Sequence, residues 1–334
     1  MVNISTIAHC FGLKPKVLYR WYISVISDYH KDRSEKRFAG WEVRQVDEQT
    51  GLILKDQPVH ILEPQNVGPN MCIDEKMIGR RYCMIISNAD TGQIALLLDS
   101  DVPALVTQAI ALLGHDALQR VEYINSDMSA AILKICRLAL PMALSVIDKF
   151  HVVKQLIDAM QSVRIEIKKK LGASTKTQRG NPNGWTNKEM LSKARYALLH
   201  NYSTMLEHEF YLLEALFKKY PKLQKAHELY CDLMLWYKRA QIRTSQAQLR
   251  LEFDQWCDKA QKYKIAAFKK LAKTMCALLP EILRYFIDGQ TNAMAENVNS
   301  RIQRLAANNY GIRNRDFFFY RCRVYFALAP QKKN

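Results

Sequence analysis

No two cysteines of this 334-residue sequence stand in Cys-x-x-Cys spacing, although the chain has eight. That spacing is typical of zinc ribbons, so no zinc site is predicted, and we expect free thiols in a reducing compartment. Long apolar runs are also missing: stretches such as 94–98 fall far below the roughly 18 residues of a membrane span. A basic-then-apolar signal pattern is absent from the N-terminus, and we therefore expect a cytoplasmic protein that has no membrane partner.

Acidic residues are scarce relative to basic ones. The chain has 49 Lys and Arg against 32 Asp and Glu, a net charge of +17, which favours a polyanion partner such as nucleic acid. The segment 67–148 is the exception, with 6 basic and 9 acidic residues, whereas 149–334 has 34 and 15. Carboxylates in a polyanion-binding protein have a role if they hold Mg²⁺, which bridges to phosphate. The alternative is that they only face solvent.

The first 27 residues predict two short helices around a turn. Gly12 can adopt the positive φ that such a turn needs, and Lys14, Lys16 and Arg20 decorate the second helix. This is the pattern of a helix-turn-helix, whose second helix enters the major groove of DNA. A plain helical hairpin is the alternative.

Residues 28–66 are polar and mixed, and we interpret them as a linker with one or two short strands. From residue 67 onward, short apolar runs separated by turn residues predict the order β-β-β-α-β-α-β-α. The predicted strands are 70–78, 80–87, 93–98, 121–125 and 143–147, and a long helix follows over 150–171.

The rest of the chain reads as helical. Residues 67–165 are predicted to form the first part of a catalytic core, and 166–288 an all-helical insertion. Residues 289–334 would complete the core with a last helix and a basic, aromatic tail. The predicted fold class is thus α/β: a mixed sheet with a large helical insertion, preceded by the small helical N-terminal segment.

Three carboxylates occupy special points of this order. Asp74 lies inside the first core strand, Asp127 follows the fourth, and Glu296 lies on the last long helix. A charge within an apolar strand is unfavourable unless it is paired or metal-bound, and α/β sheets place their sites at the carboxyl ends of strands. This is the ribonuclease H-like layout, whose acids hold two divalent ions about 3.5–4 Å apart.

Each carboxylate also has a local interpretation. Asp74 could pair with a neighbouring basic residue, Asp127 could cap the helix that follows it, and Glu296 could pair with nearby arginines. Asp148 competes with Asp127 for the second place because it ends the fifth strand. We prefer Asp127, since the end of the fourth strand is the ribonuclease H position.

Other polar residues accompany the three acids. We expect Asp148 and His151 to orient the metal-bound carboxylates or to contact DNA, with a purely structural histidine as the alternative. Asn292 and Asn299 share the polar stripe of the last helix with Glu296.

Several stretches of the sequence carry a family resemblance. They are Cys-Ile-Asp-Glu-Lys (72–76), Ser-Asp-Met-Ser (126–129), Leu-Pro-Met-Ala-Leu-Ser-Val-Ile-Asp-Lys-Phe-His-Val-Val (140–153), Ala-Met-Gln-Ser-Val-Arg (159–164), Lys-Ala-Arg-Tyr-Ala-Leu-Leu (193–199), Thr-Asn-Ala-Met-Ala-Glu-Asn-Val-Asn-Ser-Arg-Ile (291–302) and Tyr-Gly-Ile-Arg-Asn (310–314). Together they resemble DDE transposases of bacterial insertion sequences, of the family written ISL-three, over roughly the whole chain after residue 67. The resemblance implies Asp74, Asp127 and Glu296 as the catalytic, metal-binding triad, with two Mg²⁺ or Mn²⁺ ions.

The resemblance also implies an activity and partners. A transposase of this kind cleaves the ends of its own element and joins them to target DNA, as a homo-oligomer on double-stranded DNA in the bacterial nucleoid. We keep two alternatives: a decayed or repurposed DNA-binding protein, and a ribonuclease H-like nuclease that hydrolyses DNA without joining it. Full-length relatives carry a zinc-binding cysteine cluster ahead of the helix-turn-helix, which this sequence does not show. We therefore expect weaker recognition of terminal repeats, or a separate chain that supplies that region.

Basic residues outside the N-terminal segment are further candidates for DNA contacts. We single out Arg164, Arg301, Arg304 and Arg313. Arg301 and Arg304 are the strongest of these because they share a helix with Glu296, which must approach the scissile phosphate.

Overall fold

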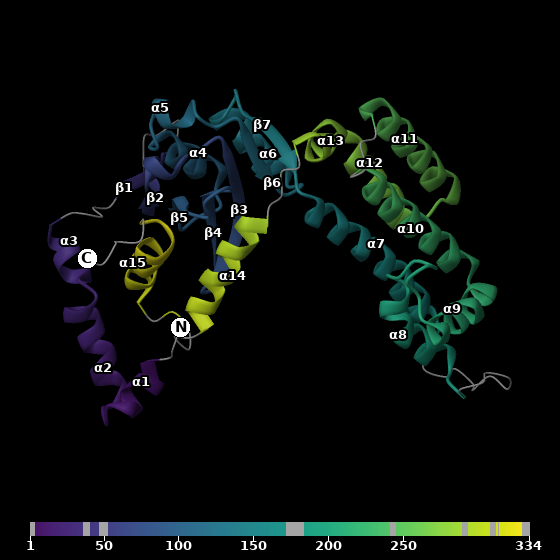
Figure 1. Ribbon diagram of the computed structural model, residues 1–334, viewed down its shortest axis with the longest axis horizontal. Helices are drawn as coiled ribbons and strands as arrows, with labels where there is room; N and C mark the ends of the chain where they lie inside the picture. Colours follow the sequence, from purple (N-terminus) through teal and green to yellow (C-terminus); the bar gives the residue numbers. More distant parts are fainter. Residues whose placement is uncertain are drawn as a thin grey trace. The chain divides into compact units, whose positions relative to one another are not determined.

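The computed structural model describes residues 4–35, 41–46, 53–171, 184–240, 245–288, 293–307, 312 and 314–328. The chain divides into two compact units (Figure 1). One comprises residues 1–148 together with 290–334, and the other comprises residues 149–289.

The first unit is built on a seven-stranded mixed sheet of order β1-β2-β5-β4-β3-β6-β7. Neighbouring strands are antiparallel from β1 to β3, and β3, β6 and β7 are parallel to one another. The strands are β1 (Trp41–Val46), β2 (Ile53–Leu62), β3 (Asn70–Ile78), β4 (Arg81–Asn88), β5 (Ile94–Leu98), β6 (Tyr123–Ser126) and β7 (Leu144–Ile147). The prediction of a mixed α/β sheet is thereby confirmed.

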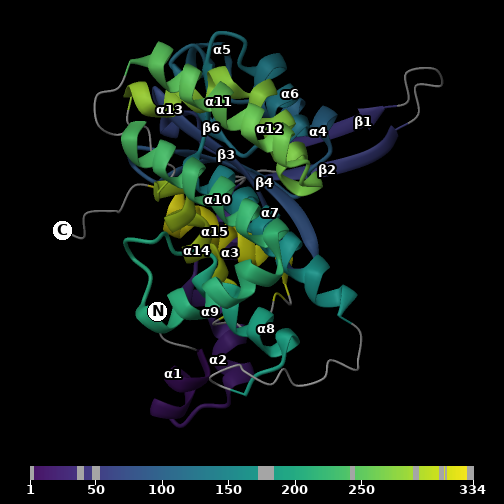
Figure 2. The same ribbon diagram turned by 90° about the vertical axis from the view of Figure 1, so that its right-hand side faces the viewer.

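Two of these strands come from the segment that we interpreted as a linker. β1 and β2 run side by side as an antiparallel pair at one edge of the sheet (Figure 2), and β2 also pairs with β5. Every second side chain of β2 from Gln57 to Ile61 is buried, which is the alternation of a half-buried strand. The short strands expected within 28–66 are therefore present, and β2 continues through Pro58 to Leu62, so this segment is part of the sheet and not a linker.

Helices cover both faces of the sheet (Figure 1). Side chains of α4 (Pro103–Ala111) and α6 (Ala130–Ala139), with the short α5 (His115–Leu118), join Met71 and Ile73 of β3 in one apolar core. On the opposite face, α14 (Ala293–Ala307) and α15 (Arg315–Phe326) form a second core over β4 and β5. The pleat of β3 therefore directs Cys72 and Asp74 towards the α14 face.

The N-terminal helices pack against α15. They are α1 (Ile4–Cys10), α2 (Pro15–Trp21), a π-helical turn (Tyr22–Ile26) and α3 (Tyr29–Ser34). The hydroxyl of Tyr320 in α15 donates hydrogen bonds to the Ser27 carbonyl, at 2.8 Å, and to the Asp32 carboxylate, at 2.9 Å.

The turn between α1 and α2 is the one the sequence predicted, since Gly12 has a φ of +66°. Two large aromatic residues of this hairpin are exposed. Phe11 is 74% exposed and Trp21 is 50% exposed, so the hairpin closes mainly on the fully buried Ala8.

The described residues of the second unit form helices and connecting loops, without a strand. The helices are α7 (Lys149–Lys170), α8 (Asn187–Ala197), α9 (Glu207–Lys219), α10 (Pro221–Ala240), α11 (Gln246–Tyr263), α12 (Ala266–Ala277) and α13 (Leu279–Asp288). α7 packs against α8, α10 and α12. Residues 149–165, which the sequence-based division gave to the sheet-bearing core, thus belong with the helical unit, because the apolar face of α7 is buried there. In the part of the chain that the structure describes, no helix is long and apolar enough to cross a membrane.

Candidate active site

Asp74 lies in the middle of the sheet, on the face that α14 covers. It stands opposite Ile85 of β4, a member of the apolar core shared with α14 and α15. Its Oδ1 accepts a hydrogen bond of 2.9 Å from the backbone N–H of Glu75. Its Oδ2 accepts one from the side-chain amide of Asn299 in α14, which is itself buried. The helix of Glu296 is thus joined directly to the carboxylate of β3.

The other two acids of the sheet lie at neighbouring strand ends. β3 and β6 are parallel with Cys72 opposite Asn125, and continuing that register brings position 127 level with Asp74. β6 and β7 are parallel with Ser126 opposite Ile147, which brings position 148 level with 127. The backbone N–H of Asp148 also donates to the Ser126 carbonyl at 3.3 Å. Three successive parallel strands therefore each present a carboxylate at about the same height.

The electrostatics reflect this proximity. Burial raises the pKa of the Cys72 thiol to about 12, and the charges of Asp148 and Asp74 add to the shift. Burial also raises the pKa of Glu75, and neighbouring carboxylates, among them Asp127 and Asp74, add to that shift. Asp148 therefore lies close enough to Cys72, and Asp127 close enough to Glu75, to shift their pKa values, as Asp74 does for both.

Asp127 and Asp148 have different surroundings. Asp148 is buried. Asp127 is half-buried, and its Oδ1 accepts a hydrogen bond of 2.8 Å from the backbone N–H of Ser129. Ser129 is itself the N-cap of α6, and no side chain caps this helix, so Asp127 braces the turn before α6 and does not have the capping role that we weighed for it. That bond occupies one carboxylate oxygen of Asp127.

Glu296 lies in α14, three residues before Asn299. Residues three apart in a helix share a face, so position 296 lies on the side of α14 that carries the bond to Asp74. The side chain of Glu296 and the whole of Asn292 lie outside the described residues. Among the side chains that are described, no three of His, Cys, Asp or Glu form a group that could hold a metal ion.

The donors that the fold does bring together are oxygen atoms. Carboxylates and an amide suit Mg²⁺ or Mn²⁺, whereas zinc prefers histidine and cysteine. The nearby thiol of Cys72 is buried, and its pKa of about 12 keeps it protonated. By donor type, these residues suit a hard divalent cation.

Two candidate residues belong to the second unit. His151 lies in α7, and its ring makes an edge-on contact with that of Phe150, at a centroid distance of 5.5 Å. Arg164 lies further along α7 and is buried.

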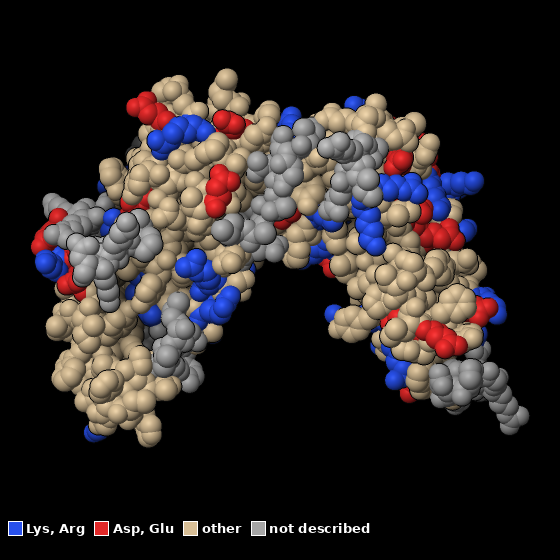
Figure 3. Space-filling model, in the orientation of Figure 1, with Lys and Arg blue, Asp and Glu red and all other residues tan. Residues whose placement is uncertain are grey.

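The remaining candidates for DNA contacts are on the surface of the first unit. Lys14, Lys16 and Arg20 are exposed on α2 and the residue before it. Arg301 and Arg304 are exposed on α14, over which Figure 3 shows basic side chains gathered. The guanidinium of Arg301 lies 4.7 Å from the centroid of the Phe326 ring. Arg313 lies outside the described residues.

Sequence reasoning missed an ion pair that fixes α15 to the sheet. Arg315 donates from Nε and Nη2 to the carboxylate of Asp99, and from Nη1 to the Ile78 carbonyl at 2.7 Å. Burial by itself would raise the pKa of Asp99, but the hydrogen bonds and charge of Arg315, together with hydrogen bonds from His60 and Cys83, outweigh it and hold that pKa well below its usual range. The only signal in the sequence was an acidic residue directly after a wholly apolar strand.

The fold and site thus define an α/β protein with an acidic side chain inside one strand, acidic residues directly after two neighbouring parallel strands, and a helix bonded to the first of these acids. Comparison with known proteins names the family. The chain matches the ISL3 family model, described as transposase, over residues 71–322. It belongs to this family of transposases, and the resemblance seen in the sequence is confirmed.

Curated relatives are similar at a lower level. The transposase for insertion sequence element IS1001 of Bordetella parapertussis is 24% identical over 249 residues, which cover 74% of this chain and 58% of the relative. The transposase for IS1557 of Mycobacterium tuberculosis is 23% identical over 245 residues, or 70% of this chain and 54% of the relative. The chain thus spans little more than half the length of these relatives. No solved structure matches.

Proposed function

We propose that this chain is a DNA transposase that cleaves the ends of an insertion sequence and joins them to target DNA. The observation that carries the proposal is the hydrogen bond between Asn299 of α14 and Asp74 of β3, next to strand ends that carry Asp127 and Asp148. It brings a helix containing Glu296 to the first of the sheet acids.

We also propose that the sheet is ribonuclease H-like. Its strands β5-β4-β3 are antiparallel neighbours, and β6 and β7 extend them as parallel strands beyond β3. Helices intervene between β5 and β6 and between β6 and β7, and a late helix covers the face of Asp74. β1 and β2 are additions at the β5 edge.

In this proposal Asp74, Asp127 and Glu296 hold two divalent cations. Bound there, the ions supply activation of a nucleophilic oxygen and stabilisation of the leaving oxygen during in-line attack on phosphorus. Asn299 fixes one oxygen of Asp74 and leaves the carboxylate a single orientation. Arg301 and Arg304 attract the DNA backbone to the helix that carries Glu296, because guanidinium groups match phosphate oxygens.

The N-terminal helices have a separate role in the proposal. α2 presents Lys14, Lys16 and Arg20 as a helix-turn-helix would, and would read the element ends. The enzyme would act as a homo-oligomer that holds two ends at once.

The experiment is a strand-transfer assay. A labelled duplex bearing an end of the element is incubated with the protein, a supercoiled target plasmid and Mg²⁺, and the joined product is resolved on a denaturing gel. We expect cleaved and joined DNA. Cleavage without joining would indicate a nuclease, and binding without cleavage would indicate a DNA-binding protein without catalysis.

A further inference from the structure

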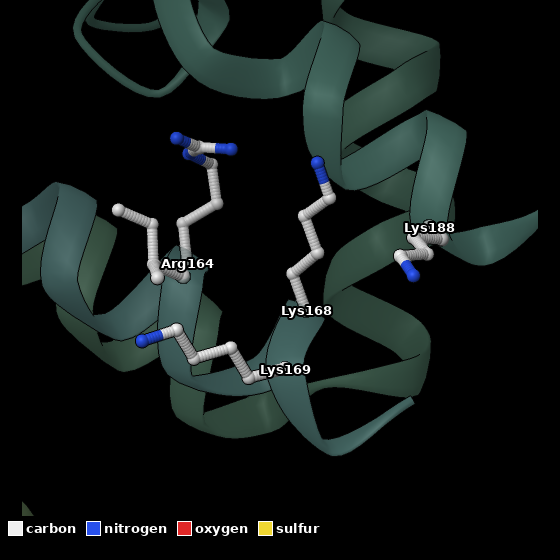
Figure 4. A pocket seen from close by; sticks show the side chains of 5 residues that line it. Arg164, Lys168, Lys169 and Lys188 are labelled. Carbon is white, nitrogen blue, oxygen red and sulfur yellow. The ribbon is translucent and has the colours of Figure 1, made fainter. Parts of the chain in front are cut away.

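A pocket in the second unit is lined almost entirely by cations. It lies where the C-terminal half of α7 meets the start of α8 and has a volume of about 450 Å³. Its lining residues are Arg164, Ile165, Lys168, Lys169 and Lys188 (Figure 4). Four of the five carry a positive charge, and none carries a negative one.

Arg164 is the unusual member of this set. Only 7% of it is exposed, and its guanidinium is held by two neutral acceptors. Nε donates to Oε1 of Gln161 at 2.6 Å, and Nη1 donates to the carbonyl of Leu191 at 3.0 Å. No carboxylate oxygen of the described residues forms an ion pair with it. Burial lowers the pKa of Arg164, and the charge of Arg195 lowers it further.

A buried guanidinium that faces other cations is unfavourable in isolation. The two neutral hydrogen bonds fix the orientation of the group but leave its charge uncompensated. An anion bound in the pocket would supply the missing compensation, and a planar guanidinium is well suited to phosphate oxygens.

The dipole of α7 explains why some of the lysines that line the pocket lie at the end of this helix. Cations in the last turn of a helix are stabilised by the dipole, and Lys168, Lys169 and Lys170 form the last turn of α7. Lys170 is moreover paired with Glu166 at 2.8 Å. The dipole does not explain Arg164, which lies a turn earlier and is buried. Figure 4 shows that Arg164 and Lys168, four residues apart, extend in the same direction.

We propose that this pocket, the α7–α8 pocket, binds a phosphate group of the DNA backbone. The inference rests on the proposed function, in that the chain acts on DNA. It adds a binding site in the helical unit that uses none of the carboxylates of the sheet. The half-exposed Ile165 at the pocket edge offers an apolar surface to a sugar. Because the contact is to phosphate, it positions the duplex without reading its sequence.

The test compares two double variants of the full-length chain. Lys168→Ala/Lys169→Ala removes two charges from the pocket. Lys269→Ala/Lys270→Ala removes two adjacent exposed charges from α12, which contributes no lining residue. Fluorescence anisotropy measures binding to an end-bearing duplex and to a random duplex over a range of salt concentrations, without divalent metal. Far-UV circular dichroism checks that each variant folds.

For the pocket variant we expect affinity to fall several-fold, by the same factor for both duplexes. The slope of log affinity against log salt should flatten by about one unit or more. The α12 variant should keep most of the wild-type affinity and slope. Equal behaviour of the two variants would overturn the proposal.

Two further outcomes distinguish DNA phosphate from free phosphate, and failure of the pocket from failure of the proposed function. If the pocket variant loses binding of inorganic phosphate in calorimetry but binds DNA as wild type does, the ligand is a free phosphate and the DNA assignment is wrong. If the wild type cleaves DNA and the pocket variant matches it at every salt concentration, only the pocket is rejected. A wild type that binds no DNA would instead reject the proposed function.

Discussion

At the scale of single residues, the hydrogen bond between Asp74 and Asn299 is the contact on which the proposed active site most depends. A carboxylate within a sheet needs partners that stabilise its negative charge. Here a backbone N–H and a side-chain amide donate hydrogen bonds to it. Both of these donors are neutral groups. They hold the Asp74 carboxylate in one orientation, which suits the proposed role of a metal ligand.

The first prediction concerns Asn299. Removing a group that orients a metal ligand typically lowers metal affinity or activity 10- to 100-fold, so Asn299→Ala should raise the Mg²⁺ concentration needed for cleavage by about that factor. Metal titrations of the cleavage rate measure this. Asn297→Ala, an exposed position of the same helix, is the control and should leave the titration unchanged. An unchanged titration for Asn299→Ala would show that Asp74 needs no help from α14.

The second prediction concerns Asp99 and acid stability. Its pKa is lowered in the folded state, so the carboxylate stabilises the fold fully above its unfolded pKa of about 4, and that contribution is lost as the pH falls from there towards the folded pKa. Asp99→Asn leaves Arg315 without its carboxylate and should lower the free energy of unfolding by about 3 kcal/mol at neutral pH. Urea unfolding at several pH values measures both effects.

A matched control is the surface pair of Asp56 and Arg44, whose side chains are about half exposed. Asp56→Asn should change the stability by less than about 1 kcal/mol. A similar loss in the two variants would mean that burial of Asp99 contributes nothing.

At the scale of elements, the sequence predicted the five strands of the core and the late helix with small boundary errors. The core strands are short apolar runs between turn residues, and Val298, Ile302 and Leu305 follow the spacing of one helix face. β2 is longer than the short strand expected within the linker, because it continues through Pro58 despite the missing N–H. The buried bonds of Arg315 and of Asn299 escaped because they join residues more than 200 positions apart in the chain.

The boundary of the helical unit also depends on tertiary contacts that the sequence pattern does not reveal. The apolar stripe of α7 predicts a helix but does not say which surface buries it. Leu156 and Met160 are equally apolar whether a sheet or other helices cover them, and here helices do. The triad of Asp74, Asp127 and Glu296 stays a prediction, and the side chain of Glu296 lies outside the described residues.

The third prediction concerns the packing of α11 against α12. The Sγ atoms of Cys257 and Cys276 lie 3.1 Å apart, and Cys276 is exposed. Diamide, which accepts two hydrogen atoms from a pair of thiols, should therefore join them as a disulfide. Peptide mapping by mass spectrometry identifies the link. It should be absent in Cys257→Ser, and a different major disulfide in the wild type would contradict the observed packing.

At the scale of the whole molecule, charge is divided between the parts of the chain. Residues 67–148 have more acidic than basic residues, whereas 149–334 have more than twice as many basic as acidic ones. In the proposed function, attraction to DNA therefore comes from outside the strands that carry the acids.

The fourth prediction concerns the basic surface of α14. Arg301→Ala/Arg304→Ala should flatten the slope of log affinity against log salt by about one to two units, as expected for the loss of two phosphate contacts. Lys134→Ala/Arg137→Ala is the control. It removes two exposed cations with the same spacing from α6, on the opposite face of the sheet. If the control flattens the slope as much, the effect reflects net charge and not the α14 surface.

The most direct test of the account is Mg²⁺-dependent cleavage of an end-bearing duplex by carboxylate variants. Asp74→Asn, Asp127→Asn and Glu296→Gln should each abolish cleavage, while DNA binding measured in EDTA stays close to that of the wild type, because each removes a charge that the cations need. Asp148→Asn should retain cleavage. Wild-type cleavage by Asp74→Asn would contradict the account, and loss of cleavage in Asp148→Asn but not in Asp127→Asn would transfer the second place to Asp148.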